Sequence, residues 1–158
     1  MSEHLIVASF DSENAAYEAA DAIRNLRNMA GADFRLKAGV MLQKDKLGNV
    51  RVLDSHVRPP FGTIVGTAVG ALIGLLAGPA GAAAGAATGA GVGAAVGAGL
   101  GLATDAVQFT FDDHFVESVK HDMRPGTTSL LLDAGEDSTS AVDRIVAKGH
   151  GRVRRQNA

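Results

Sequence analysis

The chain contains no cysteine and no tryptophan, and aromatic residues make up only 4% of its 158 residues. The lack of cysteine excludes disulfide bonds, thiolate catalysis and cysteine-based metal sites. The scarcity of aromatic residues removes large side chains that usually help to build a soluble core. Since hydrophobic residues still reach 46%, the apolar surface must come mainly from alanine, valine, leucine and isoleucine.

The chain also lacks a large excess of charge of either sign, because 15 basic and 17 acidic residues leave a formal net charge of −2. So weak a field gives no reason to expect nucleic acid as a partner. Residues 1–14 hold no basic stretch ahead of an apolar run, so they do not read as a signal peptide. We therefore expect the first polar segment to stay in the cytoplasm.

The largest change of composition bounds a segment, residues 59–104, that holds none of the charged residues. It separates a polar front, residues 1–58, from a polar back, residues 105–158. The prediction is therefore a polar domain formed by residues 1–58 together with 105–158, and an inserted apolar unit at 59–104.

Hydrophobic periodicity predicts β-α-β-β in the front and α-β-α-β in the back. The expected strands are residues 5–10, 34–43, 50–53, 127–133 and 152–155, and the expected helices are 13–29, 112–123 and 138–148. Asp11 or Ser12 is expected to cap the first helix, and Gly31 to end it. One buried face of the second strand is indicated by the alternate positions Phe34, Leu36, Ala38, Val40 and Leu42.

This order predicts an α+β fold, a ferredoxin-like antiparallel sandwich with helices on one face of the sheet. The elements β-α-β-β-α-β would form the sandwich, and the last helix and strand would extend it. The apolar unit would then be an insertion between the third strand and the second helix.

Within the apolar unit, glycine recurs every four residues in two unbroken runs. The first run is Gly62, Gly66, Gly70, Gly74 and Gly78, and the second is Gly81, Gly85, Gly89, Gly93, Gly97 and Gly101. Residues four apart lie on one face of a helix, so each run forms a groove in which another backbone can approach closely. The break at Gly78-Pro79 permits a reversal of the chain. The segment therefore predicts a helical hairpin, a glycine zipper, and the eleven glycines are its candidate packing residues.

The two predicted helices of the hairpin differ in bulk. The first offers a lipid-facing surface made of Ile64, Val65, Val69, Leu72, Ile73, Leu75 and Leu76. The second is almost all alanine and glycine, so it needs protein neighbours to cover it. Each interior glycine costs roughly 1 kcal/mol of helix propensity in water, which either a bilayer or a protein interior must offset. Packing between copies is the expected solution, and we predict a homo-oligomer.

Two surroundings for the hairpin remain open. A membrane span needs about 20 apolar residues, and the predicted helices of the hairpin are close to this length, so they suit transmembrane helices. Arg51 and Arg58 before the segment favour a cytoplasmic polar domain at the inner membrane. In the alternative, a soluble cytoplasmic particle or filament buries the hairpins in its interior. Anchoring and packing explain the hairpin better than a pore, because its only hydroxyl groups are those of four threonines.

Several motifs together resemble a known family. They are Leu5-Ile6-Val7 before an Ala-rich helix, the turn at residues 45–50, the glycine hairpin, and the segments 111–116 and 123–130, which hold an acidic pair and a Pro-Gly before an apolar strand. The pattern resembles the bacterial and archaeal family of predicted membrane proteins catalogued as domain-of-unknown-function family number 1269. The resemblance spans nearly the whole chain and implies membrane association and a ferredoxin-like polar part. It implies no biochemical activity, so no functional residue is carried over.

Chemical sites are weakly indicated. None of the five histidines forms a metal-type pair, and His114 and His121 are best explained as solvated helix residues. Asp112 and Asp113 suit a helix N-terminus, and no glycine run continues as a phosphate-binding loop. Residues 152–155 suit a charged edge strand or a contact with lipid headgroups. We predict no catalytic residue, no metal, no cofactor and no small-molecule substrate, and therefore a non-enzymatic protein whose partners are itself and membrane lipid.

Overall fold

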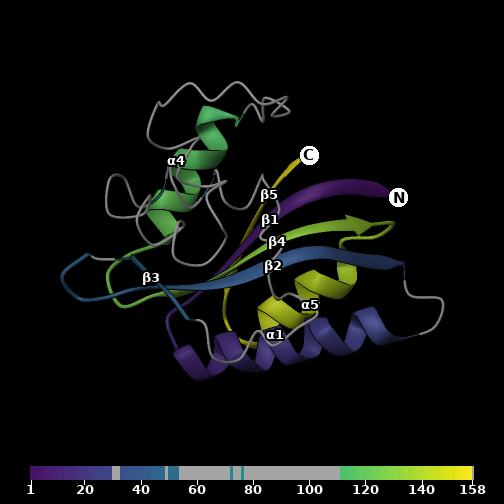
Figure 1. Ribbon diagram of the computed structural model, residues 1–158, viewed down its shortest axis with the longest axis horizontal. Coiled ribbons are helices and arrows are strands. Elements are labelled where there is room, and N and C mark those ends of the chain that lie inside the picture. The colour runs from purple at the N-terminus through teal and green to yellow at the C-terminus, as the bar shows by residue number, and fades with distance from the viewer. Residues whose placement is uncertain (30–32, 49, 54–71, 73–75, 77–110, 158) are drawn as a thin grey trace.

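The computed structural model describes residues 1–29, 33–48, 50–53, 72, 76 and 111–157 (Figure 1). In these ranges the chain is an α+β structure with one five-stranded antiparallel sheet. The elements are β1 (Ser2–Phe10), α1 (Glu13–Asn28), β2 (Phe34–Lys44), β3 (Val50–Val52), α4 (Asp113–Asp122), β4 (Thr128–Glu136), α5 (Ser140–Lys148) and β5 (Arg152–Asn157). The predicted class and the predicted order of elements are confirmed for this part of the chain.

The strands lie in the order β3-β2-β4-β1-β5. The longest continuous pairing joins β1 to β4, from Ser2 opposite Glu136 to Phe10 opposite Thr128. β4 and β1 lie inside the sheet, whereas the short β3 and the arginine-rich β5 form its edges. The sheet therefore depends on a central pair of strands that are far apart in the sequence.

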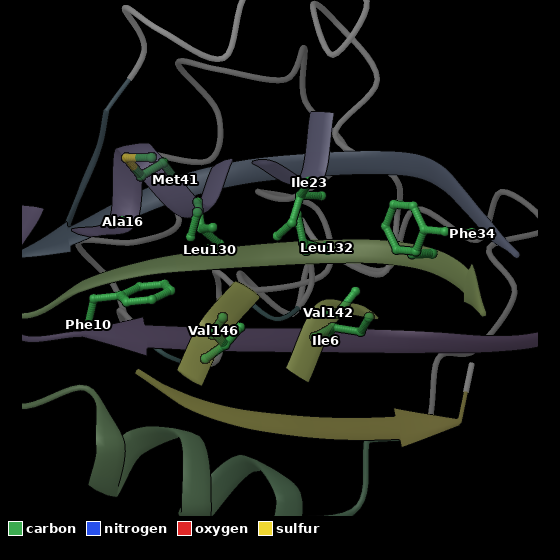
Figure 2. Close-up of a cluster of buried hydrophobic side chains, with 13 residues drawn as sticks. Ile6, Phe10, Ala16, Ile23, Phe34, Met41, Leu130, Leu132, Val142 and Val146 are labelled. Atoms are coloured by element: carbon green, nitrogen blue, oxygen red, sulfur yellow. The ribbon is translucent and has the colours of Figure 1, made fainter. Parts of the chain in front are cut away.

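Both faces of this central pair are apolar. Ile6, Ala8 and Phe10 point to the face that α1 and α5 cover, and Leu5 and Val7 point to the opposite face. Figure 1 shows α1 and α5 together on one side of the sheet and α4 on the other. Figure 2 shows the first of the two resulting cores, in which side chains of β1, β2 and β4 meet those of α1 and α5.

The expectation that the helices share one face is wrong for α4. Its apolar side chains Phe115, Val116 and Val119 belong to the core cluster of Leu5 and Val7, on the face opposite α1 and α5. The physical reason is the continuous burial of residues 5–10, since a strand that is apolar on both faces must be covered on both.

The expected single buried face of β2 is also wrong, because the strand contains a bulge. Leu36 lies opposite Ala134 and Ala38 lies opposite Asp133, so Lys37 is an extra residue in β2. A bulge reverses the alternation of side chains. Before it, Phe34 packs with α1 and α5, and after it, Val40 and Leu42 pack on the α4 side.

The start of α1 is capped as the sequence predicts. Ser12 caps α1, and its hydroxyl accepts a hydrogen bond from the N–H of Ala15 at 3.3 Å. The predicted stop at Gly31 lies outside the described residues, and α1 ends at Asn28. After α5, Gly151 has a packing role, since a Cβ there would lie 2.6 Å from Cε1 of Phe10. The glycine thus lets the start of β5 approach the core.

Candidate functional site: the α4 face of the sheet

The eleven ladder glycines, from Gly62 to Gly101, lie outside the described residues, so their predicted packing role stays a prediction. Two leucines of the apolar unit are described, and both are helical: Leu72 and Leu76. Both lie at one place, the side of the sheet that α4 covers, which we call the α4 face. This face is the candidate functional site, because the two described residues of the apolar unit pack against the polar domain there.

The α4 face carries a compact apolar cluster. Its buried members are Leu5, Val7, Val40, Leu42, Leu72, Phe115, Val116, Val119, Met123 and Leu131, and Val50, Leu76 and Phe111 pack against them. The strands β1, β2 and β4 supply one side of the cluster, and α4 supplies three buried side chains that cover it, with Met123 following directly after the helix. Leu72 completes the cluster with an exposed fraction of 0%.

The burial of Leu72 corrects part of the sequence analysis, which assigned it to a lipid-facing surface. Its side chain is instead a core residue of the polar domain. The physical reason is that α4 has only ten residues, while the α4 face includes apolar side chains from three strands. Leu76, four residues further along the sequence, packs against the same cluster.

A buried carboxylate fixes the C-terminal end of α4 to the edge strand. The side chain of Asp122 is only 4% exposed. Arg154 Nε donates to Asp122 Oδ2 at 2.7 Å, and Arg152 Nη2 donates to the Asp122 carbonyl at 3.2 Å. The hydrogen bond to Asp122 raises the pKa of the Arg154 guanidinium above its ordinary value. A buried carboxylate needs such partners, so these contacts hold α4 in one position on the sheet.

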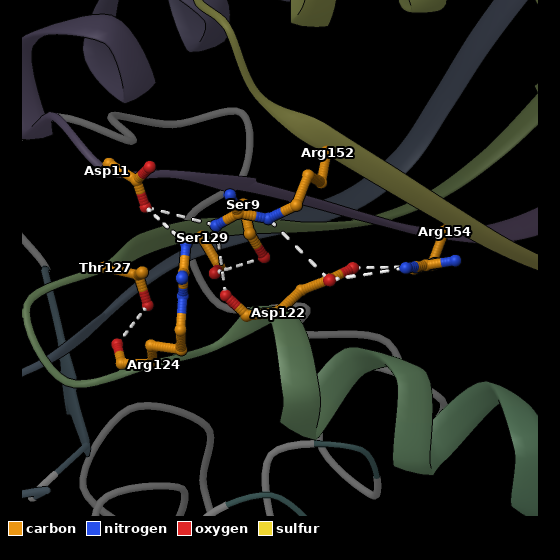
Figure 3. A network of polar contacts seen from close by, with 8 residues as sticks. All are labelled: Ser9, Asp11, Asp122, Arg124, Thr127, Ser129, Arg152 and Arg154. Atoms are coloured by element: carbon orange, nitrogen blue, oxygen red, sulfur yellow. Dashed lines mark hydrogen bonds and ion pairs between the residues drawn. The ribbon is translucent and has the colours of Figure 1, made fainter.

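Further polar groups continue this network towards the start of α1 (Figure 3). The hydroxyls of Ser9 and Ser129, both buried, lie 2.9 Å apart between β1 and β4. Arg152 Nη2 donates to Asp11 Oδ1 at 3.1 Å. That hydrogen bond and the charge of Arg152 hold the pKa of the Asp11 carboxyl below its usual range. The network is therefore explained by internal pairing, without a substrate.

The N-terminal end of α4 is fixed as well. Asp112 caps the helix, as predicted: its Oδ1 accepts hydrogen bonds from the N–H groups of His114 and Phe115 at 2.8 and 3.1 Å. The N–H of Asp112 itself donates to Gln156 Oε1 of β5 at 2.9 Å. An open hollow of about 540 Å³ lies here between α4 and β5. Both ends of α4 are thus attached to the edge strand.

A second buried carboxylate lies on the opposite face, and sequence reasoning missed it. Glu136, whose side chain is 0% exposed, accepts from Arg155 Nε at 2.9 Å and lies 3.1 Å from Nδ1 of His4. Arg155 also forms an ion pair with Asp143 at 2.7 Å. Burial acts to lower the pKa of the Arg155 guanidinium, but the hydrogen bonds to Glu136 and Asp143 outweigh it and raise that pKa. The sequence signal for this contact is the alternation of side chains along β5, which places Arg155 on the opposite face of the strand from its two neighbours.

The predicted reading of the histidines on α4 fits the structure, since His114 and His121 are both exposed. Among the described residues, no group of three or more histidine or acidic side chains is placed to hold a metal ion. The arginines of β5 are engaged with Asp122 and Glu136 rather than free at the sheet edge.

Comparison with protein-family models, with curated proteins and with solved structures finds no match for this chain. The resemblance to the family of predicted membrane proteins therefore stays a prediction. Within the described ranges, no helix is long and apolar enough to cross a membrane.

Leu72→Ala tests the place of Leu72 in the core. Truncation of a fully buried leucine leaves a cavity and should lower the free energy of unfolding by about 2–5 kcal/mol. Leu47→Ala is the matched control, because Leu47 is 87% exposed and its truncation should change stability by no more than about 0.5 kcal/mol. Urea unfolding followed by circular dichroism measures both variants, and equal effects of the two would contradict the core position of Leu72.

Asp133 gives a pH-dependent prediction. Burial, aided by the charge of Glu3, raises the pKa of its carboxyl against the opposing effect of Lys37. Since folding raises this pKa, the contribution of Asp133 to stability is greatest below the pKa of the unfolded chain and is lost as the pH rises through the folded value. Asp133→Asn cannot ionise, so its free energy of unfolding should rise relative to that of the natural chain between about pH 3 and about pH 7.

Unfolding of both proteins in urea across this pH range measures the difference. Asp21→Asn is the matched control, because it removes the same charge from an exposed position on α1. A difference curve for Asp133→Asn that is flat, or that falls towards neutral pH, would show that burial does not control this carboxyl.

Proposed function

We propose that the chain is a non-enzymatic, membrane-associated protein that assembles into homo-oligomers through the glycine-lined hairpin of residues 59–104. The observation that carries the assembly part of the proposal is the complete burial of Leu72 on the α4 face. It couples the glycine-rich unit to the folded domain, so packing between hairpins would fix the relative positions of whole domains. The uncharged, glycine-lined sequence around Leu72 supplies the packing surface.

We also propose a ferredoxin-like arrangement for the polar domain, with a different choice of elements from the one the sequence suggested. The units β1-α1-β2 and β4-α5-β5 each join two strands through a helix, and their strands lie in the order β2-β4-β1-β5. The helices α1 and α5 pack in one shared cluster on the same face. In this arrangement β3, the apolar unit and α4 form a single insertion between β2 and β4. The same arrangement supports the proposed kinship with the family of predicted membrane proteins.

The mechanism is one of assembly. Close packing along the glycine runs would offset the low helix propensity of glycine, and the partners of this packing would be other copies of the chain. The fixed position of α4, held by Asp122 and Asp112, supports a defined orientation of the hairpin on the domain. The polar domain would lie in the cytoplasm, at the inner membrane.

The burial of Leu72 specifically favours a second candidate, a soluble cytoplasmic assembly that hides the hairpins in its interior. The first predicted helix of the hairpin covers residues 60–77. If Leu72 stays against the sheet, only residues 60–71 of this helix are free to enter a bilayer. At about 1.5 Å per residue they reach roughly 18 Å, whereas a hydrocarbon core is about 30 Å thick. Membrane insertion would then require release of Leu72 or a shallow, interfacial position of the hairpin.

Cell fractionation distinguishes the two candidates. For the membrane-associated protein we expect recovery in the membrane pellet, extraction by mild detergent rather than by salt, and an oligomeric mass in that detergent. Since the expected contacts with lipid are apolar, salt should not release the protein. A large particle in the soluble fraction would establish the second candidate. A monodisperse monomer both with and without detergent would contradict both candidates.

The double variant Gly70→Leu with Gly93→Leu tests the glycine ladders. Two leucines in the grooves would keep the backbones apart, so the oligomer should dissociate or lose at least tenfold in association constant, since overpacking costs about 1–3 kcal/mol at each site. Ala71→Leu with Ala94→Leu adds bulk one residue away from each ladder and should largely retain assembly. Mass measurement in mild detergent compares them, and an intact oligomer in the glycine variant would mean that the ladders are not packing contacts.

A further inference from the structure

The turn between β2 and β3 presents an unusual apolar side chain. Leu47 is 87% exposed, more than Met29 at 63% or Met1 at 52%, which are the other exposed large hydrophobic residues in the described part of the chain. Exposed leucines occur singly on many proteins, so exposure alone assigns no role. Its importance here rests on the rigidity, the charge and the position of the turn.

The turn is held in a defined shape. The N–H of Leu47 donates to Asp45 Oδ1 at 2.8 Å, and the N–H of Gly48 donates to the Asp45 carbonyl at 3.1 Å. Gly48 has a φ of +86°, a value that glycine adopts without strain. At the base, Lys44 exchanges backbone hydrogen bonds with Gly126 and Thr127 at 2.7 and 3.0 Å. Leu47 is therefore projected into solvent by a fixed support.

The charge around Leu47 differs from that of the chain. Residues 44–51 contain Lys44, Lys46 and Arg51 but one acidic residue, Asp45, which gives +3 − 1 = +2 against −2 for the whole protein. The carboxylate of Asp45 is bound to the turn backbone. Lys46 and Arg51 are both exposed, whereas Arg124 of the neighbouring loop is exposed but forms an ion pair with Asp11 at 3.6 Å. An exposed apolar residue with exposed basic residues on both sides of it in the sequence is complementary to an anionic lipid surface.

The position of the turn connects it with the apolar unit. Leu42, near the end of β2, is buried in the same cluster as Leu72, and Val50, at the start of β3, packs against that cluster. The end of β2 and the start of β3, which support the turn, thus lie at the cluster that Leu72 joins. A membrane that lies against this part of the domain would be within reach of the turn.

We propose that the β2–β3 turn is a second, peripheral membrane contact, in which Leu47 enters the interface of an anionic bilayer and Lys44 and Lys46 face its headgroups. This inference rests on the proposed membrane association and gives it a detail, namely which end of the polar domain faces the lipid. The contact would orient the domain on the surface, while the hairpin would provide the main attachment.

The absence of tryptophan from the chain allows a direct test with the full-length protein. Leu47→Trp places the only tryptophan at the tip, and Met29→Trp, at the end of α1, is the matched control. Each protein is mixed with phosphatidylcholine vesicles that contain or lack phosphatidylserine. We expect the emission of Leu47→Trp to shift to shorter wavelength with phosphatidylserine vesicles and the emission of Met29→Trp to stay unchanged.

A second pair of variants tests the charges. Lys46→Glu should weaken binding to phosphatidylserine vesicles by about fivefold or more, given the effect of each basic residue near an anionic surface. Lys148→Glu reverses an exposed lysine at the end of α5 and should leave that binding unchanged. Equal losses for the two lysine variants would overturn the assignment.

Failure of this inference is separable from failure of the proposed function. If the protein sediments with vesicles but the emission of Leu47→Trp does not move, the turn is not a membrane contact and the membrane association stands. If no variant sediments with any vesicle, the membrane association itself fails. A shift that appears without vesicles and grows with protein concentration would assign the tip to a contact with a second copy, which also overturns the inference.

Discussion

The structure depends on a sheet whose two central strands are apolar on both faces. β1 and β4 pair along nine residues each, and their side chains enter two separate cores. Neither face can be left in water without exposing a contiguous apolar patch. The helices α1 and α5 cover one face, whereas α4 alone is too short for the other, and Leu72 of the glycine-rich unit joins it there. The α4 face thus takes part of its cover from outside the predicted polar domain.

The buried charges serve this arrangement. Asp122 accepts hydrogen bonds from the edge strand and keeps α4 in place, while Glu136 joins the end of β4 to Arg155 on the other face. The arginines of β5 thus act as internal partners rather than as a free basic tail. In such pairs, removal of one partner leaves the other buried and unsatisfied, so side chains on both faces of β5 constrain the fold.

Much of the fold could be predicted from the sequence, because its elements are short and strongly patterned. The Ser12 and Asp112 caps, the amphipathic helices and the order of helices and strands along the chain follow from local signals. Pattern alone could not place Leu36 and Val40 on opposite faces, since the extra residue Lys37 is visible only in the pairing with β4. It could not assign α4 to its own face or bring Asp122 to Arg154, because these contacts join residues that are distant in the sequence. At the candidate site, the separation of the apolar unit from the domain stays a prediction, and the sequence did not predict that Leu72 is part of the core.

The position of Leu72 has a thermodynamic consequence for the proposed assembly. One side chain belongs both to the core of the domain and to the segment that would pack between copies, so the folding equilibrium and the association equilibrium share a common state. Any contact that holds this segment in place stabilises the sheet below it, and any loosening of the sheet weakens the association to the same extent, by linkage. The stability of a single copy is then a function of protein concentration rather than a fixed property of the chain.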